Sequence, residues 1–157
     1  MKKVLIAFPV IILMATGCVA KTPPRDTIVP DLDKAPSITQ GISGNAKIIS
    51  GDCMPSTAAK TTCRTEPARS RKITVRELTT YKQMGNGKPT TRLVAQTTTT
   101  NAGAYAVSIA AGTYSIFIYD DQEREICNSF DGKMNACSVV VGDGVTQYDV
   151  TLDQAVY

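Results

Sequence analysis

The sequence has no histidine and no tryptophan among its 157 residues, and aromatic residues make up only 6% of it. Without histidine, the chain cannot build a histidine-based catalytic triad, a histidine-ligated metal site or a histidine pH switch. No serine stands in a Ser-x-x-Lys motif that would give it a neighbouring base. We therefore expect a protein that is not an enzyme, with no catalytic residue, no cofactor and no metal site.

Net charge is also small. The chain has 17 Lys and Arg against 14 Asp and Glu, a formal net charge of +3. If Lys2 and Lys3 are removed with an export signal, 15 basic residues remain against 14 acidic ones, a net charge of +1. A chain so close to neutral is not expected to bind nucleic acid. Apolar residues make up 43% of the chain, which is typical of a globular domain.

The first residues have the pattern of an export signal. Met1-Lys2-Lys3 is basic, residues 4–14 form an apolar run interrupted only by Pro9, and residues 15–17 are small. A basic start, a short apolar run and small residues are typical of a secretory signal peptide. The run is shorter than the roughly 20 apolar residues that a membrane span needs. We expect residues 1–17 to be a signal peptide.

The residues Ala15-Thr16-Gly17-Cys18 resemble the lipobox of bacterial lipoproteins, although Ala15 stands where Leu is commoner. The resemblance implies that the Cys18 thiol receives a diacylglycerol, that the chain is cut before Cys18, and that the new amino group is acylated, with palmitate as the expected acyl group. Each acyl chain contributes about 0.8 kcal/mol per buried methylene, so several chains hold a protein durably on a membrane. Val19, rather than Asp, follows the cysteine. In Gram-negative lipoproteins that implies sorting to the outer membrane.

Residues 18–41 are predicted to be the lipidated cysteine followed by a proline-rich tether. Prolines at positions 23, 24, 30 and 36 are mixed with charged residues, and large apolar side chains are few. Proline removes backbone donors and fixes φ, so neither a continuous helix nor a central strand fits this segment. Composition favours an extended spacer, with a partner-binding segment around Ile28-Val29-Pro30 as the alternative.

Residues 42–157 consist largely of short runs in which apolar and polar residues alternate, and these runs are rich in Thr, Val, Ile and Tyr. Such runs of period two, separated by turns that contain Gly and Asn, are typical of half-buried strands. The expected strands are residues 42–50, 72–78, 92–99, 104–109, 113–119, 138–141 and 145–152. No window has the pattern of an amphipathic helix. The sequence therefore predicts an all-β fold, a seven-stranded antiparallel sandwich of Ig-like architecture.

Two turns are the most distinctive part of this pattern. Residues 99–105 read Thr-Thr-Asn-Ala-Gly-Ala-Tyr, and residues 111–114 read Ala-Gly-Thr-Tyr. Asn and Gly supply the positive φ values of a tight turn, and we expect Tyr105 and Tyr114 to point into the sandwich. The two turns resemble the T-D/N-x-x-G-x-Y…P/A-G-x-Y signature of carboxypeptidase regulatory-like domains, a prealbumin-like (transthyretin-like) family. The resemblance spans residues 42–152 and implies a seven-stranded binding or accessory module without catalytic residues.

Four cysteines remain after Cys18: Cys53, Cys63, Cys127 and Cys137. An even number in an exported chain predicts two disulfides, for which three pairings exist. Successive cysteines flank loops and are ten residues apart, so we favour Cys53–Cys63 and Cys127–Cys137. A zinc site would need pairs two to four residues apart, and a redox site a Cys-x-x-Cys pair. Neither spacing occurs.

The predicted binding residues lie in or beside the first of two long loops, residues 51–71 and 120–136. A disulfide orders such a loop before binding and lowers the entropic cost of binding through it, although export alone also explains disulfides. Our candidates for contact with an acidic partner or an anionic polymer are Arg64, Arg69, Arg71 and Lys72. The alternative is that these residues are solvated and break up an exposed strand edge.

The second loop begins with an acidic run, residues 120–125, whose carboxylates are of the kind that bind calcium. The run lacks an Asp-x-Asp-x-Asp-Gly pattern and contains Arg124, which favours a solvated acidic turn. Further along the same loop, Asp131-Gly132-Lys133 is interpreted as a plain turn.

Together these features predict a non-catalytic, lipid-anchored protein of the bacterial cell envelope. We expect its partners to be a membrane, through the acyl chains on Cys18, and an envelope protein or surface polymer, through the disulfide-stapled loops. The alternative is a structural subunit of an envelope-spanning secretion or surface-fibre assembly.

Overall fold

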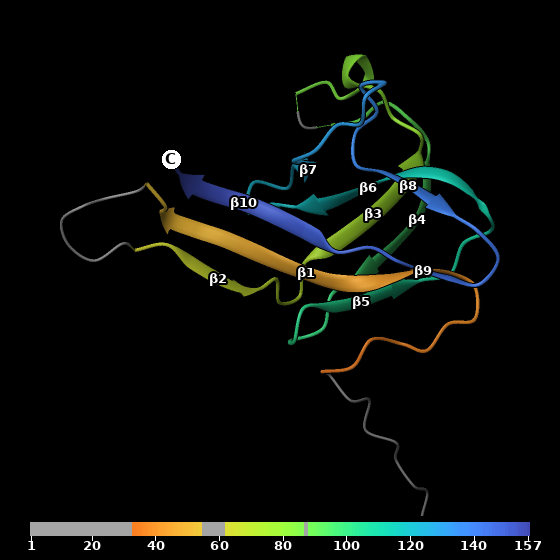
Figure 1. The fold of residues 1–157 in the computed structure, drawn as a ribbon, viewed down its shortest axis with the longest axis horizontal. Coiled ribbons are helices and arrows are strands. Elements are labelled where there is room, and N and C mark those ends of the chain that lie inside the picture. The colour runs from red at the N-terminus through yellow and green to blue at the C-terminus, as the bar shows by residue number, and fades with distance from the viewer. Residues whose placement is uncertain (1–32, 55–61, 87) are drawn as a thin grey trace, which may run out of the picture.

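The chain folds into two β-sheets and one turn of 3-10 helix, seen in a computed structural model that describes residues 33–54, 62–86 and 88–157 (Figure 1). The first sheet contains β1 (Gly41–Asp52), β2 (Arg64–Pro67), β5 (Ala104–Val107), β9 (Val145–Gln147) and β10 (Val150–Val156). The second contains β3 (Lys72–Glu77), β4 (Leu93–Thr98), β6 (Gly112–Tyr119), β7 (Glu125–Ile126) and β8 (Ser138–Val141). The 3-10 helix η1 (Tyr81–Gln83) follows β3. The predicted all-β, sandwich-like fold of the domain is confirmed.

The hydrophobic core lies between the two sheets and follows the alternation of the sequence. In β3, Ile73 and Val75 are completely buried, and Ile116 and Ile118 of β6 occupy the same inner face. The first sheet contributes Ile42, Ala46, Tyr105, Val107, Val150 and Leu152 to the same cluster. Each large side chain buried here stabilises the fold by about 1.5–3 kcal/mol relative to exposure.

Tyr105 lies at the centre of this core, as predicted. Its side chain has no exposed surface, and its hydroxyl donates a hydrogen bond to the main-chain oxygen of Tyr148. Burial raises the pKa of the Tyr105 hydroxyl well above its usual range, with smaller contributions from Tyr148 and Asp149. Tyr114 packs against the same core and is partly buried. The turn before β5 uses Gly103 at a φ of +81°.

Strand β1 pairs with the last part of the chain in parallel, a departure from the purely antiparallel arrangement predicted. β9 pairs with the first part of β1 and β10 with the second, in one continuous register. The run 145–152 is interrupted at residues 148–149, where the Asn45 amide donates to the Asp149 side chain at 2.8 Å. The chain approaches Gly44 closely there: a Cβ on Gly44 would lie 1.9 Å from the Tyr148 carbonyl oxygen. With β2 and β7 added, ten strands are present in the described residues, where seven were predicted.

One edge of β6 is shared by β8 and β7. β8 pairs with the beginning of β6, residues 112–115, and β7 with its end, residues 118–119. Between them the Ile116 amide donates a hydrogen bond to the Cys137 carbonyl oxygen. The loop between β7 and β8 therefore leaves the sheet and returns to it at neighbouring points of β6.

The outer face of the second sheet contains a buried ion pair, which corrects the prediction of a solvated acidic turn. Glu125 is only 3% exposed, and its carboxylate accepts hydrogen bonds from Arg76 Nε at 2.9 Å and Nη2 at 2.8 Å, in a bidentate arrangement. Thr74 also donates to this carboxylate, and Arg76 Nη1 donates to the Thr91 carbonyl oxygen. Asp120, at the start of the same run, is 7% exposed and pairs with Arg124. Two of the acidic side chains are therefore structural.

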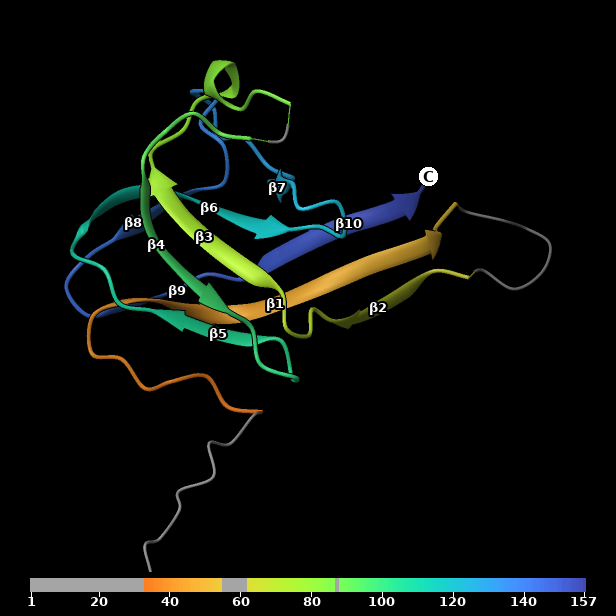
Figure 2. The same ribbon diagram turned by 180° about the vertical axis from the view of Figure 1, so that it is seen from behind.

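The two loops that follow β3 and β7 meet at one end of the sandwich. Figures 1 and 2 show η1 at this end and the first described residues, which lead into β1, at the opposite end. The outer ends of β1 and β2 project to a third side. In the described residues, no helix is long and apolar enough to cross a membrane.

Candidate functional site

Both predicted disulfides are present, with the favoured pairing. Cys53–Cys63 joins the end of β1 to the segment before β2, and Cys127–Cys137 closes the loop between β7 and β8. The predicted signal peptide, the lipidation residue Cys18 and residues 19–32 of the predicted tether lie outside the described residues.

The four predicted contact residues do not form one free basic patch. Arg71 Nη1 lies 2.6 Å from the Asp121 carboxylate, and Lys72 Nζ lies 4.6 Å from the centroid of the Tyr119 ring. This ion pair lowers the pKa of the Asp121 carboxyl. Arg64 on β2 and Arg69 in the turn before β3 are exposed. Two of the four basic groups therefore already have partners within the chain.

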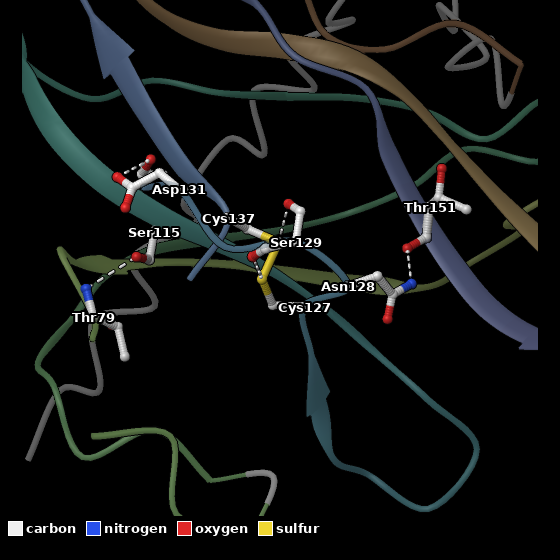
Figure 3. The surroundings of a disulfide bond; sticks show 9 residues. Thr79, Ser115, Cys127, Asn128, Ser129, Asp131, Cys137 and Thr151 are labelled. Carbon is white, nitrogen blue, oxygen red and sulfur yellow. Dashed lines mark hydrogen bonds between the residues drawn. A yellow bond between two sulfur atoms is a disulfide. The ribbon is translucent and has the colours of Figure 1, made fainter. Parts of the chain in front are cut away.

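The loop closed by Cys127–Cys137, here called the stapled loop (residues 127–137), is joined along its length to the segment after β3. The Ala136 amide donates to the Thr79 carbonyl oxygen at 2.8 Å, and the Tyr81 amide donates to the Met134 carbonyl oxygen at 2.9 Å. The Ile116 amide of β6 donates to the Cys137 carbonyl oxygen, and Asn128 Nδ2 donates to a β10 carbonyl oxygen. Beside the loop, the buried Thr79 amide donates to Ser115 Oγ of β6 (Figure 3). The stapled loop is therefore fixed to both sheets and to η1.

Asp131 organises the interior of the stapled loop. One carboxylate oxygen accepts the amides of Lys133 and Asn135 at 2.8 and 2.9 Å. The other accepts the Asn135 side chain at 2.8 Å and the Ser138 hydroxyl at 3.0 Å. These hydrogen bonds, those from Asn135 first, lower the pKa of the Asp131 carboxyl to about 2. The turn predicted at residues 131–133 is present, and Asp131 is in addition the centre of the loop's hydrogen bonds.

Three large apolar side chains are exposed on the stapled loop and on η1. Tyr81, Phe130 and Met134 are 60%, 40% and 52% exposed. The rings of Tyr81 and Phe130 meet edge to face, with centroids 5.6 Å apart. We call these three side chains, with Lys82 and Lys133, the tip cluster.

Met134 has a backbone conformation and an exposure that are unusual for methionine. Its φ is +63°, in the left-handed region that glycine or asparagine occupies at lower cost, and its side chain is half exposed. Methionine at such a position adds strain to the folded chain and buries little in return. Strained residues of this kind cluster at sites that bind other molecules.

The tip cluster borders a shallow hollow of about 330 Å³, lined by Thr80, Tyr81, Lys82, Lys133 and Met134. No hydrogen bond or ion pair of the described residues engages the ammonium group of Lys82 or Lys133. The hollow is therefore lined by apolar side chains and by two lysines without a partner in the described residues, and we call these two lysines its basic rim.

The hydrogen bonds around Asp131 predict a pH dependence of stability. Because folding lowers the pKa from its ordinary value of 3.8 to about 2, the ionised carboxylate stabilises the folded chain above about pH 4. That contribution is lost as the pH falls from about 4 to about 2. Urea unfolding from pH 6 to 2 should show a stability difference between the wild type and Asp131→Asn that shrinks over this interval. A constant difference down to pH 2 would contradict this role of Asp131.

The tip cluster was not predicted from the sequence. Contact was predicted through Arg64, Arg69, Arg71 and Lys72, which follow the first disulfide. The composition of the two loops could have indicated this site, because residues 79–92 contain no acidic residue and Asp131 is the only one in the stapled loop.

In the described residues, no group of three or more Cys, Asp and Glu is placed to hold a metal ion. No protein-family model, curated protein or solved structure matches the chain.

Proposed function

We propose that the protein is a non-catalytic, lipid-anchored component of the bacterial cell envelope that binds a partner through the tip cluster. The observation that carries this proposal is the group of three exposed apolar side chains on the stapled loop and on η1, which is hydrogen-bonded to that loop. Solvent-exposed apolar side chains that gather on a rigid frame mark interaction sites. The absence of histidine from the sequence argues against most acid–base and nucleophilic mechanisms.

A protein is a better partner for this site than a surface polymer. Tyr, Phe and Met are enriched where proteins bury apolar surface against one another. The basic residues at Arg64 and Arg69 remain candidates for contact with an anionic polymer, but they precede β3, whereas the tip cluster follows it. Since β3 spans six residues of about 3.3 Å each, the two surfaces lie at opposite ends of that strand.

The proposal includes a carboxypeptidase regulatory-like, prealbumin-like identity for the sandwich. Three observations support it: the tight turn at Gly103, the buried Tyr105 immediately after it, and the packing of Tyr114 against the core. The extra strands and the parallel pairing of β1 set this domain apart from the simple seven-stranded antiparallel pattern.

In-cell crosslinking with mass spectrometry tests the proposed function, together with labelling by palmitate. The wild type should incorporate labelled palmitate and capture one dominant envelope protein. Cys18→Ser, exported with an ordinary signal, should take up no label. Capture by the lipidated form alone would indicate an assembly subunit that is placed by its anchor. Retention of both forms on peptidoglycan or lipopolysaccharide, with no protein captured, would contradict the choice of a protein partner.

A further inference from the structure

We propose that the hollow of the tip cluster recognises an acidic peptide segment: one large apolar side chain flanked by carboxylates. This inference rests on the proposed function and names the chemistry of the partner at that site. It follows from the size of the hollow, the charge of its rim and the rigidity of its frame.

The hollow has room for a large apolar side chain. Its volume of about 330 Å³ is about twice that of an engineered cavity of about 150 Å³ that holds one benzene molecule. Tyr81 and Met134 form apolar walls from two different loops, η1 on one side and the stapled loop on the other. An aromatic or long aliphatic side chain placed between them would bury apolar surface on both sides, which favours the complex.

The charge around the hollow selects acidic neighbours for that side chain. Lys82 from η1 and Lys133 from the stapled loop line the same hollow. Lys88 and Arg92 add positive charge in the same segment, although Arg92 is already paired with Glu77. The only acid of the stapled loop, Asp131, is engaged by three donors within that loop and by the Ser138 hydroxyl of β8. The rim therefore offers unpaired cations to carboxylates on either side of the apolar side chain.

The rigid frame lowers the cost of binding. The ladder between Thr79 and Ala136, the hydrogen bonds of Asp131 and the Cys127–Cys137 disulfide order the site before a partner arrives. A preordered site loses little conformational entropy on association. A peptide that protrudes from a partner protein can therefore bind without rearrangement of the tip.

A peptide fits this site better than a lipid surface. The tip cluster lies at the opposite end of the sandwich from the first described residues. The predicted lipid anchor at Cys18 precedes those residues in the chain. For the tip cluster to contact the bilayer that holds the anchor, the domain would have to rotate until this opposite end faced the bilayer. The hollow between two loops also selects a single inserted side chain, whereas an interfacial membrane site presents a broad apolar face.

Binding of synthetic peptides tests the inference. The protein is the full chain with Cys18→Ser, exported with an ordinary signal. The probes are the fluorescein-labelled peptide Gly-Asp-Glu-Phe-Glu-Asp-Gly, a version with Ala in place of Phe, and a version with Lys in place of every acid. The first should bind at least about tenfold more tightly than either other peptide, and its affinity should fall as salt increases. Equal affinities for the three peptides would overturn the inference.

Two variants test whether binding occurs at the hollow. Met134→Gly removes an apolar wall at a φ of +63° that glycine accepts, so the fold should persist while affinity for the Phe peptide falls several-fold. Lys82→Glu with Lys133→Glu should reverse the preference, from the acidic to the lysine peptide. Lys34→Glu with Lys47→Glu, an equal charge change on exposed residues before and within β1, is the control and should leave the preference unchanged. A reversal in the control variant would overturn the proposed site.

Failure of the inference can be told apart from failure of the proposed function. If in-cell crosslinking captures an envelope protein through the tip cluster but no peptide shows a preference, the peptide chemistry is wrong and the proposed function stands. Vesicles of phosphatidylglycerol and phosphatidylethanolamine provide the remaining test. Binding to these vesicles that Met134→Gly weakens, together with no peptide preference, would assign the hollow to lipid and overturn the inference.

Discussion

Replacing Glu125 with alanine is expected to lower the free energy of unfolding by about 3 kcal/mol. The variant leaves the Arg76 guanidinium, whose side chain is only 16% exposed, without its bidentate partner on the outer face of the second sheet. It also leaves Thr74, which is 1% exposed, without the acceptor for its hydroxyl. An uncompensated charge and an unsatisfied donor both destabilise a folded chain. Urea unfolding followed by circular dichroism measures the change.

A matched exposed pair provides the control for Glu125. Arg92 and Glu77 form an ion pair with side chains 71% and 50% exposed, so Glu77→Ala should change stability by at most about 1 kcal/mol. The double variant Arg76→Met/Glu125→Leu should recover much of the loss, because it removes both charges together. A loss for Glu125→Ala no larger than that for Glu77→Ala would contradict the structural role of the pair.

Removing the second disulfide, by Cys127→Ser with Cys137→Ser, is expected to cost about 3 kcal/mol. The chain-entropy contribution follows from the short loop that the bond closes, with a sequence separation of 10. The effect should also be local. Amide exchange should accelerate most in the stapled loop and in the residues of η1 joined to it, since the loop loses its covalent connection beside β6. Urea unfolding and amide exchange followed by mass spectrometry measure both effects.

The other disulfide provides the comparison. Cys53–Cys63 has the same sequence separation, so its loss should have a similar effect on global stability. It should leave exchange in the stapled loop unchanged, because it joins the outer ends of β1 and β2. Equal loosening of the stapled loop in the two double variants would show that the loop does not depend on its own disulfide.

Much of the fold could be predicted from local pattern. The strands around Ile73, Tyr105 and Ile116 were placed within one or two residues, because alternation on a half-buried face leaves a clear period of two. The tight turn at Gly103 and the inward direction of Tyr105 followed from turn chemistry. The two disulfides followed from spacing alone.

The remaining features depend on contacts between distant residues. Short strands such as β2 and β7 have too few residues to show a period. β7 is seen only through its pairing with β6 and the contact of Glu125 with Arg76 of β3. The tip cluster joins single apolar residues from two loops, Tyr81 from one and Phe130 from the other. The hydrogen bonds between residues 79–81 and residues 134–136 join the two loops, so no local run of sequence could show them as one site.

The most direct test of the account places a photo-crosslinking amino acid at single positions of the protein in cells. The chosen positions are Phe130 in the tip cluster and Val140 on β8, which is 71% exposed and serves as the matched control. The account predicts that position 130 captures one defined envelope protein and that position 140 captures none. Capture of that protein from position 140, with none from position 130, would contradict the assignment of binding to the tip cluster.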